Sequence, residues 1–223
     1  DLYSNSGSPS LIAPRQVLNK IIRLLKENDL KAVVAPELEF YLCEKNLDPN
    51  IPLLTPVGKS GRRANGSDVF GIDSVNEFDV FLDDIYDYCE MLDIGVDTLV
   101  HESGPSQIEI NLNHGDPLKL ADQTFMFKRA VRQVALKHGI HATFMAKPHQ
   151  GQPGSSMHIH QNLVSIKDDK NIFTDLDGKE TNNFYHYIGG LQEYLPDAMV
   201  FFAPYVNSYR RFVMNSSAPI NTH

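Results

Sequence analysis

The segment Lys31–Glu44, KAVVAPELEFYLCE, constrains the fold of this chain more than any other stretch. Its residues alternate in character, so Leu38 and Phe40 occupy one face of a predicted strand, and Glu37 and Glu39 occupy the other. The same strand is unusually apolar for a sheet edge, which favours a place inside a sheet. The alternative interpretation is a half-buried strand whose glutamates face solvent.

Helical and strand patterns alternate in mixed order along the rest of the chain. Helices are predicted from Pro14 to about Asn28, over Asp79–Leu92 and Pro117–His138, and from about Asn183. Further strands are predicted over Val96–Glu102, Gln107–Leu112, Ile140–Lys147 and Ser155–Leu163, and long loops over Asp48–Phe70 and Pro204–Pro219. This order favours an α+β fold over a doubly wound one. Residues 1–10 are polar and predict a linker or a frayed end.

Composition excludes several classes of protein. The 223 residues are 42% hydrophobic and 22% charged, which is typical of a soluble globular chain. No apolar run reaches the ~18 residues that a membrane span requires. The net charge of -8 argues against nucleic acid as the main partner. Two cysteines form neither a disulfide framework nor a zinc motif, so the cytoplasm is the expected compartment.

Two further segments carry acidic or imidazole side chains on strands. Glu102 ends one predicted strand and Glu109 lies inside the next, and the turn SGPS between them would let the two carboxylates face one another. His158 and His160 share a face of the strand in GSSMHIHQNL. Unrelated surface carboxylates, and histidines without a ligand, are the alternatives for each segment taken alone.

Taken together, these residues predict a metal site. Several glutamates that converge on one site cannot all remain ionised without a counter-charge. Oxygen ligands with one imidazole suit Mg²⁺ or Mn²⁺ better than zinc. Carboxylate-held magnesium usually binds substrate phosphates, so the residues predict magnesium-dependent phosphoryl transfer on a curved sheet.

Four ordered motifs resemble the glutamine synthetase family. They are APELEFYL, HESGPSQIEINLNHGD, ATFMAKPHQGQPGSSMHIHQNL and NSYRRFV followed by SAPIN, and the resemblance runs from about Leu11 to His223. Within the family the chain looks most like the γ-glutamylpolyamine (γ-glutamylputrescine) synthetases. The resemblance implies a curved, mostly antiparallel sheet with flanking helices. It also implies that residues 11–223 are a partial catalytic domain, without the family's N-terminal β-grasp domain and C-terminal part.

The resemblance implies roles for particular residues. One ion would be held by Glu39, Glu102 and Glu109. A second would be held by Glu37, His158 and a glutamate from a segment beyond His223. His160 corresponds to a residue at the nucleotide phosphates, Gly154 to a backbone position beside the glutamate substrate, and Arg211 to an arginine that grips the substrate carboxylate.

The implied reaction uses ATP to phosphorylate the γ-carboxylate of glutamate, after which an amine displaces phosphate. Two departures point to a polyamine such as putrescine rather than ammonia: Ser217 stands where bacterial glutamine synthetases carry a glutamate, and Pro153 replaces a usual asparagine. Glutamine synthetase proper and a non-catalytic member or fragment are the alternatives. The family also implies a homo-oligomer of stacked rings, in which a neighbouring subunit completes the active site.

Overall fold

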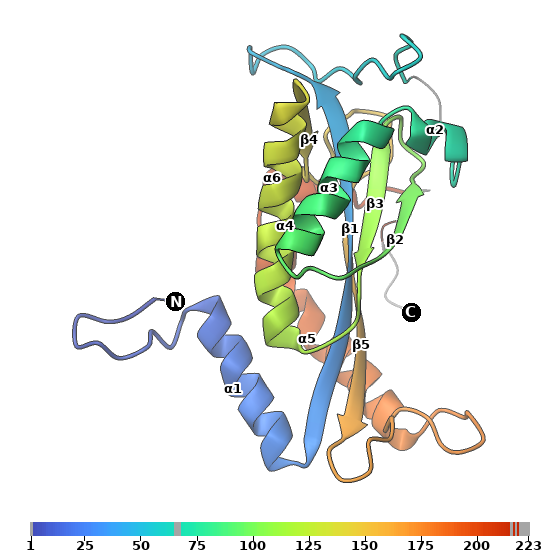
Figure 1. Cartoon of the computed structure of the whole chain (residues 1–223). Helices are drawn as coiled ribbons and strands as arrows, with labels where there is room; N and C mark the ends of the chain where they lie inside the picture. Colours follow the sequence, from blue (N-terminus) through green and yellow to red (C-terminus); the bar gives the residue numbers. More distant parts are fainter. Residues whose placement is uncertain (1, 65–67, 215, 217, 219–223) are drawn as a thin grey trace. The chain divides into compact units, whose positions relative to one another are not determined.

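The computed structural model describes residues 2–64, 68–214, 216 and 218. Its elements are α1 (Pro14–Glu27), β1 (Leu30–Glu44), α2 (Ile72–Asn76), α3 (Asp79–Met91), β2 (Val96–His101), β3 (Gln107–Leu112), α4 (Pro117–Lys137), β4 (Ile140–Thr143), β5 (Met157–Ser165), α5 (Asn182–Phe202) and α6 (Val206–Tyr209) (Figure 1). They fall into two compact units. The first unit comprises the residues up to Ala35 together with His114–Gln123 and Ile159–Pro196; the second comprises Pro36–Asn113, Thr124–His158 and the chain from Asp197 onward.

Strand β1 is central in the sheet. The pairs β1–β3, β1–β4 and β2–β3 are antiparallel. The strand order is β2-β3-β1-β4, and β5 also pairs with β1. In the second unit β1 pairs with β3 on one side and with β4 on the other. The expected α+β class, with helices around an antiparallel sheet, is therefore confirmed.

The core of the second unit forms where β1 is buried on both faces. Leu38 and Phe40 are buried as expected, but Glu39 is only 8% exposed and Tyr41 is fully buried. The solvent-face alternative for Glu39 is therefore wrong. Fully buried Ile108 and Ile110 on β3 extend this core. Further buried side chains come from α3 (Phe81, Leu82, Ile85, Cys89) and from α4 (Phe127, Val131, Val134, Ala135).

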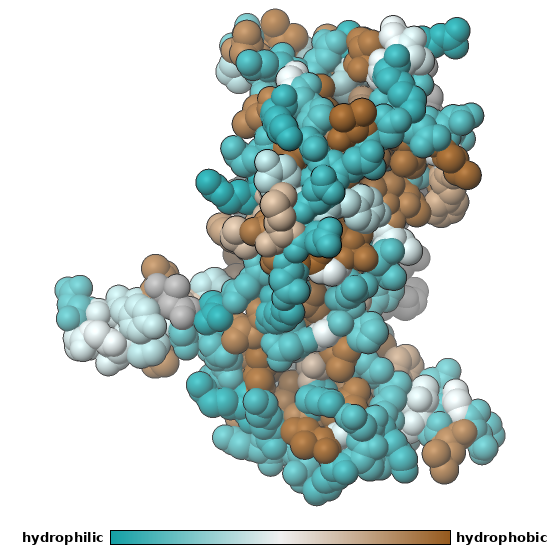
Figure 2. Space-filling view, viewed as in Figure 1, coloured by the Kyte–Doolittle hydropathy of each residue, from teal (hydrophilic) through white to brown (hydrophobic). Residues whose placement is uncertain are grey.

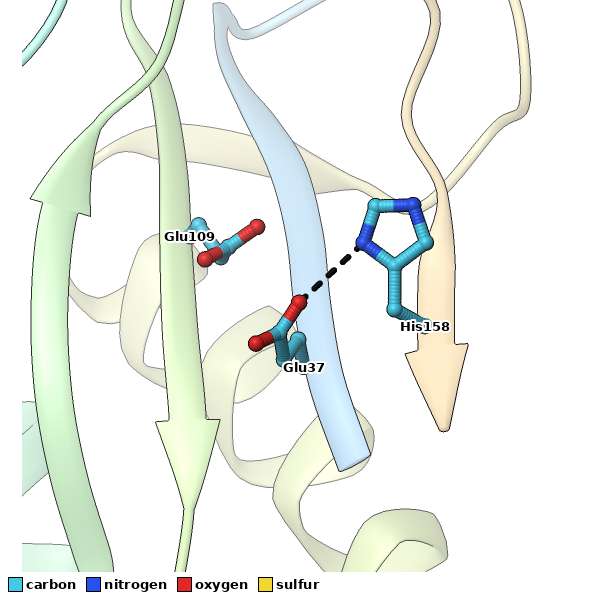
Figure 3. A group of neighbouring side chains, drawn as sticks. All are labelled: Glu37, Glu109 and His158. Carbon is cyan, nitrogen blue, oxygen red and sulfur yellow. Dashed lines mark hydrogen bonds and ion pairs between the residues drawn. The ribbon is translucent and has the colours of Figure 1, made fainter. Parts of the chain in front are cut away.

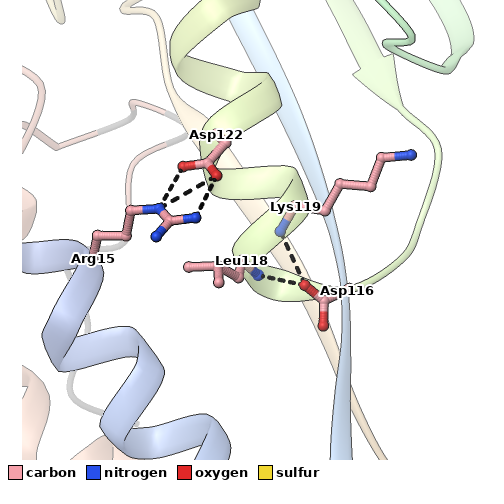
Figure 4. A network of polar contacts seen from close by, with 5 residues as sticks. All are labelled: Arg15, Asp116, Leu118, Lys119 and Asp122. Atoms are coloured by element: carbon pink, nitrogen blue, oxygen red, sulfur yellow. Dashed lines mark hydrogen bonds and ion pairs between the residues drawn. The ribbon is translucent and has the colours of Figure 1, made fainter. Parts of the chain in front are cut away.

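In the first unit, polar contacts define the start of α4. Asp116 caps the helix, because its Oδ1 accepts hydrogen bonds from the backbone N–H groups of Leu118 and Lys119 at 3.0 Å each (Figure 4). Arg15 on α1 donates from Nη2 to Oδ2 of Asp122 at 3.0 Å. The Arg15–Asp122 contact joins α1 to the first turns of α4.

Two short helices lie where the sequence predicted loop or no element. The helices α2 and α6 have five and four residues, which is too short for a helical repeat of apolar residues to be recognised. The predicted strand Ile140–Lys147 ends at Thr143, because the Thr143 hydroxyl accepts the N–H of Met145 at 3.1 Å and the chain turns there.

Large apolar side chains also reach the surface (Figure 2). In the second unit Phe201 and Val206 are both 81% exposed. Among the described residues, no helix combines the length and the apolar character needed to cross a bilayer.

Candidate metal and substrate site

In the second unit, acidic and imidazole groups come from β1, from β3, from the start of β5 and from the residue after β2. Glu37 and Glu39 both lie on β1, and Glu39 is the register partner of Glu109 on β3. Residues that are directly opposite on antiparallel strands point to the same face. Glu102 follows β2 immediately, and His158 lies near the start of β5.

The tightest group consists of Glu37, Glu109 and His158 (Figure 3). One ligand atom from each residue lies within 4.8 Å of the other two. His158 Nδ1 lies 3.1 Å from Oε2 of Glu37. The set of two carboxylates and one imidazole therefore fits a divalent cation that prefers oxygen ligands.

Glu109 lies among the other carboxylates. The pKa of Glu109 is raised, first by partial burial and then by the negative charge of Glu37, with further contributions from Glu102 and Glu39. A bound cation would remove this repulsion, because an opposite charge favours the ionised form. The expected convergence of the four glutamates is thus present in the second unit.

The Glu39 carboxylate is held by three hydrogen-bond donors. Its Oε2 accepts from Gln107 Nε2 and from the backbone N–H of Ser156, each at 3.0 Å. Its Oε1 accepts from the Ser156 hydroxyl. These donors orient a nearly buried carboxylate.

A cavity of about 430 Å³ opens beside these groups. Its walls include the acidic Glu39 and Glu102 and the basic Lys147 and Arg211. Burial lowers the pKa of Arg211, and the negative charge of Glu39 partly offsets that effect. Gly154 also lines the cavity, and a Cβ at this position would lie 2.6 Å from the carbonyl oxygen of Ala146 and 2.7 Å from Cγ of Arg211. Only glycine fits there without displacing the arginine.

His160 belongs to the first unit, whereas the other predicted site residues belong to the second. It lines another cavity of about 430 Å³, together with Val34, His114, Asn162 and Phe173. Ser217, on which the choice of amine partly rests, lies outside the residues that the structure describes.

Sequence reasoning missed Gln107, Ser156 and Lys147. Gln107 precedes Glu109 by two residues on the same strand, so the alternation places both on one face. The sequence could have indicated Gln107 by its place on the polar face of this strand, two residues before Glu109. Ser156 and Lys147 lie outside β4 and β5, although the sequence predicted strands that include them, so the alternation of those predicted strands could not indicate their contacts.

Comparison with known proteins identifies the family. The family model described as glutamine synthetase, catalytic domain, matches residues 11–223. The chain therefore belongs to the glutamine synthetase family.

Individual relatives agree with this assignment. The gamma-glutamylputrescine synthetase PuuA of Escherichia coli (strain K12) is 38% identical over 213 residues, which is 95% of this chain and 45% of that protein. A glutamine synthetase of Pyrococcus abyssi (strain GE5 / Orsay) is 35% identical over 214 residues, or 96% of this chain and 46% of that protein. The chain thus spans about half the length of the curated relatives it matches.

Solved structures share the fold. A structure described as apo GmaS without ligand superposes with a TM-score of 0.77 at 27% identity, over 92% of this chain and 47% of that one. A glutamine synthase homologue superposes with a TM-score of 0.81 at 20% identity, over 95% of this chain and 46% of that one, and this shows the fold alone.

Proposed function

We propose that this chain carries the metal and glutamate sites of an ATP-dependent ligase that joins the γ-carboxylate of glutamate to an amine through γ-glutamyl phosphate. One observation carries the proposal. Glu37, Glu109 and His158 form a cation-type ligand group, and the adjoining cavity contains Glu39, Glu102 and the cation Arg211. The family relation supports the same class of reaction.

We assign the divalent ions, Mg²⁺ or Mn²⁺, to the acidic face. Glu39, Glu102 and Glu109 would hold one ion, and Glu37 and His158 would contribute to a second. Glu109 is close to Glu37 and His158, so it would border both ions. Bound ions of this type neutralise charge on a transferring phosphoryl group.

The substrates would be oriented by the walls of the cavities. Arg211 would pair with a carboxylate of glutamate, for which a planar guanidinium is well suited. Gly154 would let the substrate approach the backbone, because no side chain projects there. His160 and its separate cavity in the first unit would serve the phosphates of ATP. A loop over the site must exclude water, since an acyl phosphate hydrolyses easily.

The acceptor we propose is a primary amine of the putrescine type. Support comes from Ser217 and Pro153 in the sequence and from the 38% identity with a gamma-glutamylputrescine synthetase. Ammonia is the second candidate, because a glutamine synthetase is 35% identical over a similar span. An uncharged serine would not hold ammonium by charge, whereas it leaves room for an alkyl chain.

Turnover is the direct test. Phosphate release would be measured with glutamate, ATP, Mg²⁺ and either putrescine or ammonia. The assay would use a protein that contains this chain and has the full length of its relatives. A higher kcat/KM for putrescine is expected. A preference for ammonia would overturn the choice of amine but not the ligase chemistry, and no release with either amine would favour a non-catalytic subunit.

The 223 residues alone are expected to bind metal without turnover, because relatives use about twice this length. Steady turnover by the purified 223-residue chain would contradict that expectation. We further propose that the protein of full family length works in the cytoplasm on small molecules and assembles as a homo-oligomer of stacked rings. Light scattering after size exclusion would test the assembly.

A further inference from the structure

The side chain of Gln107 joins three segments of the second unit. Its Nε2 donates both to Oε2 of Glu39 and to the carbonyl oxygen of Gly154, each at 3.0 Å. Its Oε1 accepts the backbone N–H of Gly104 at 2.9 Å. Gln107 is 1% exposed, so the amide works in a site from which water is excluded.

These three bonds use the whole amide. Both Nε2 protons are donated, one to a carboxylate and one to a backbone carbonyl, and the amide oxygen is occupied by the β2–β3 turn. A planar amide with every hydrogen-bonding group engaged has no second orientation of equal energy. The separation between the Glu39 carboxylate and the Gly154 carbonyl is therefore set through Gln107.

Tyr41 independently holds the loop that contains Pro153 and Gly154. Its hydroxyl donates to the carbonyl oxygen of Pro153 at 2.8 Å. Tyr41 reaches the residue next to Gly154, but the described hydrogen bonds include none from its hydroxyl to Glu39. The two side chains thus separate two effects: Tyr41 holds the loop, whereas Gln107 holds the loop and the carboxylate together.

We infer that Gln107 is a positioning residue, which orients Glu39 for a divalent cation and fixes that carboxylate relative to the Gly154 wall of the substrate cavity. This inference rests on the proposed function. Groups that hydrogen-bond to a metal ligand affect metal affinity, and their removal typically costs ~10–100-fold.

The test compares Mn²⁺ dissociation constants by electron paramagnetic resonance on the 223-residue chain. Gln107→Met keeps the volume and removes every hydrogen bond of the amide. We expect at least a tenfold loss of Mn²⁺ affinity, within the ~10–100-fold range, and a changed spectrum of the bound ion. Tyr41→Phe and the exposed control Gln133→Met should bind within twofold of the wild type. Glu109→Gln serves as the ligand-loss reference.

The outcomes separate the inference from the proposed function. If the wild type binds Mn²⁺ and Gln107→Met binds it equally well with an unchanged spectrum, the positioning role is overturned and the metal site stands. Equal losses in Tyr41→Phe and Gln107→Met would overturn it too, because a loosened loop would explain both. If the wild type binds no Mn²⁺, the proposed metal site fails and the inference fails with it.

A second variant covers the case in which Gln107→Met does not fold. Gln107→Asn keeps the amide but is one methylene shorter, so it cannot reach Glu39 and Gly154 at once. Circular dichroism would establish which variant is folded. Wild-type affinity in a folded Gln107→Asn chain would overturn the inference.

Discussion

Glu39 and Glu109 are direct register partners on the antiparallel strands β1 and β3, so two carboxylates share one face of the sheet. Like charges in this arrangement destabilise a sheet. Donors from Gln107 and Ser156 compensate Glu39, whereas the pKa of Glu109 is raised by burial and by the surrounding glutamates. The pair thus stores an electrostatic cost that a bound cation would relieve.

The first prediction concerns the metal-free chain. A carboxyl group whose pKa is raised in the folded state contributes stability that is fully present below its unfolded pKa and is lost as pH rises through the folded value. Glu109→Gln should therefore raise the melting temperature at pH 7 in the presence of a chelator. The difference in melting temperature between the two proteins should shrink at pH values below 4.5, the ordinary pKa of a glutamate side chain. Calorimetry across this range checks the expectation, and a lower melting temperature for the variant at pH 7 would contradict it.

The second prediction concerns the same two proteins in the presence of metal, which should stabilise the wild type more than Glu109→Gln. A ligand that binds only the folded state stabilises it by RT ln(1 + [L]/Kd), or ~2.7 kcal/mol at one hundred times Kd. Saturating Mn²⁺ should therefore raise the melting temperature of the wild type much more than that of Glu109→Gln. An equal rise in both proteins would remove Glu109 from the ligand set.

Sequence reasoning found the elements and ligands that follow a local rule. Alternation along β1 and β3 placed Glu37, Glu39 and Glu109 on one face, and Pro117 marked the start of α4. The part played by Gln107 was beyond such reasoning, because its partners Glu39 and Gly154 come from segments far apart in the sequence. Burial of β1 on both faces likewise depends on helices that pack from elsewhere in the chain.

A third prediction concerns a polar contact between α3 and the end of α4. Asp84 Oδ2 lies 2.8 Å from Lys137 Nζ and 2.7 Å from His138 Nε2. Hydrogen bonds from Lys137 first, and then from His138, lower the pKa of Asp84. A lowered carboxyl pKa contributes stability above the unfolded value, and that contribution is lost as pH falls through the folded one.

Asp84→Asn should therefore destabilise the chain slightly at pH 7. The difference should begin to shrink near the ordinary pKa of 3.8 and disappear as pH falls through the lower pKa of the folded state. The effect is small because the group is solvent-accessible. Chemical denaturation at several pH values measures it, with the exposed neighbour Asp83→Asn as the matched control. A constant difference at all pH values would show that charge is not the cause.

A fourth prediction concerns the two thiols. Cys43 and Cys89 are buried, and burial raises their pKa values to about 12 and about 11. Because the thiolate is the reactive form, neither thiol should react with a disulfide reagent at pH 8 while the chain is folded. Both should react at once in denaturant. Rapid reaction of either thiol in the native chain would contradict its burial.

The last prediction concerns Gly104, in the turn between β2 and β3. A Cβ at this position would lie 1.8 Å from the Tyr41 hydroxyl and 2.7 Å from Oε1 of Gln107, so Gly104→Ala must displace the two side chains that fasten the Pro153–Gly154 loop. Overpacking of this kind costs ~1–3 kcal/mol. Gly189, inside α5, is the control, because a Cβ there meets nothing within 4 Å and alanine is favoured in a helix by ~1 kcal/mol. We expect Gly104→Ala to lower the free energy of unfolding and to weaken Mn²⁺ binding, while Gly189→Ala leaves Mn²⁺ binding unchanged and the chain equally or more stable. Wild-type stability and Mn²⁺ affinity in Gly104→Ala would show that the turn and its two side chains can move without disturbing Glu39.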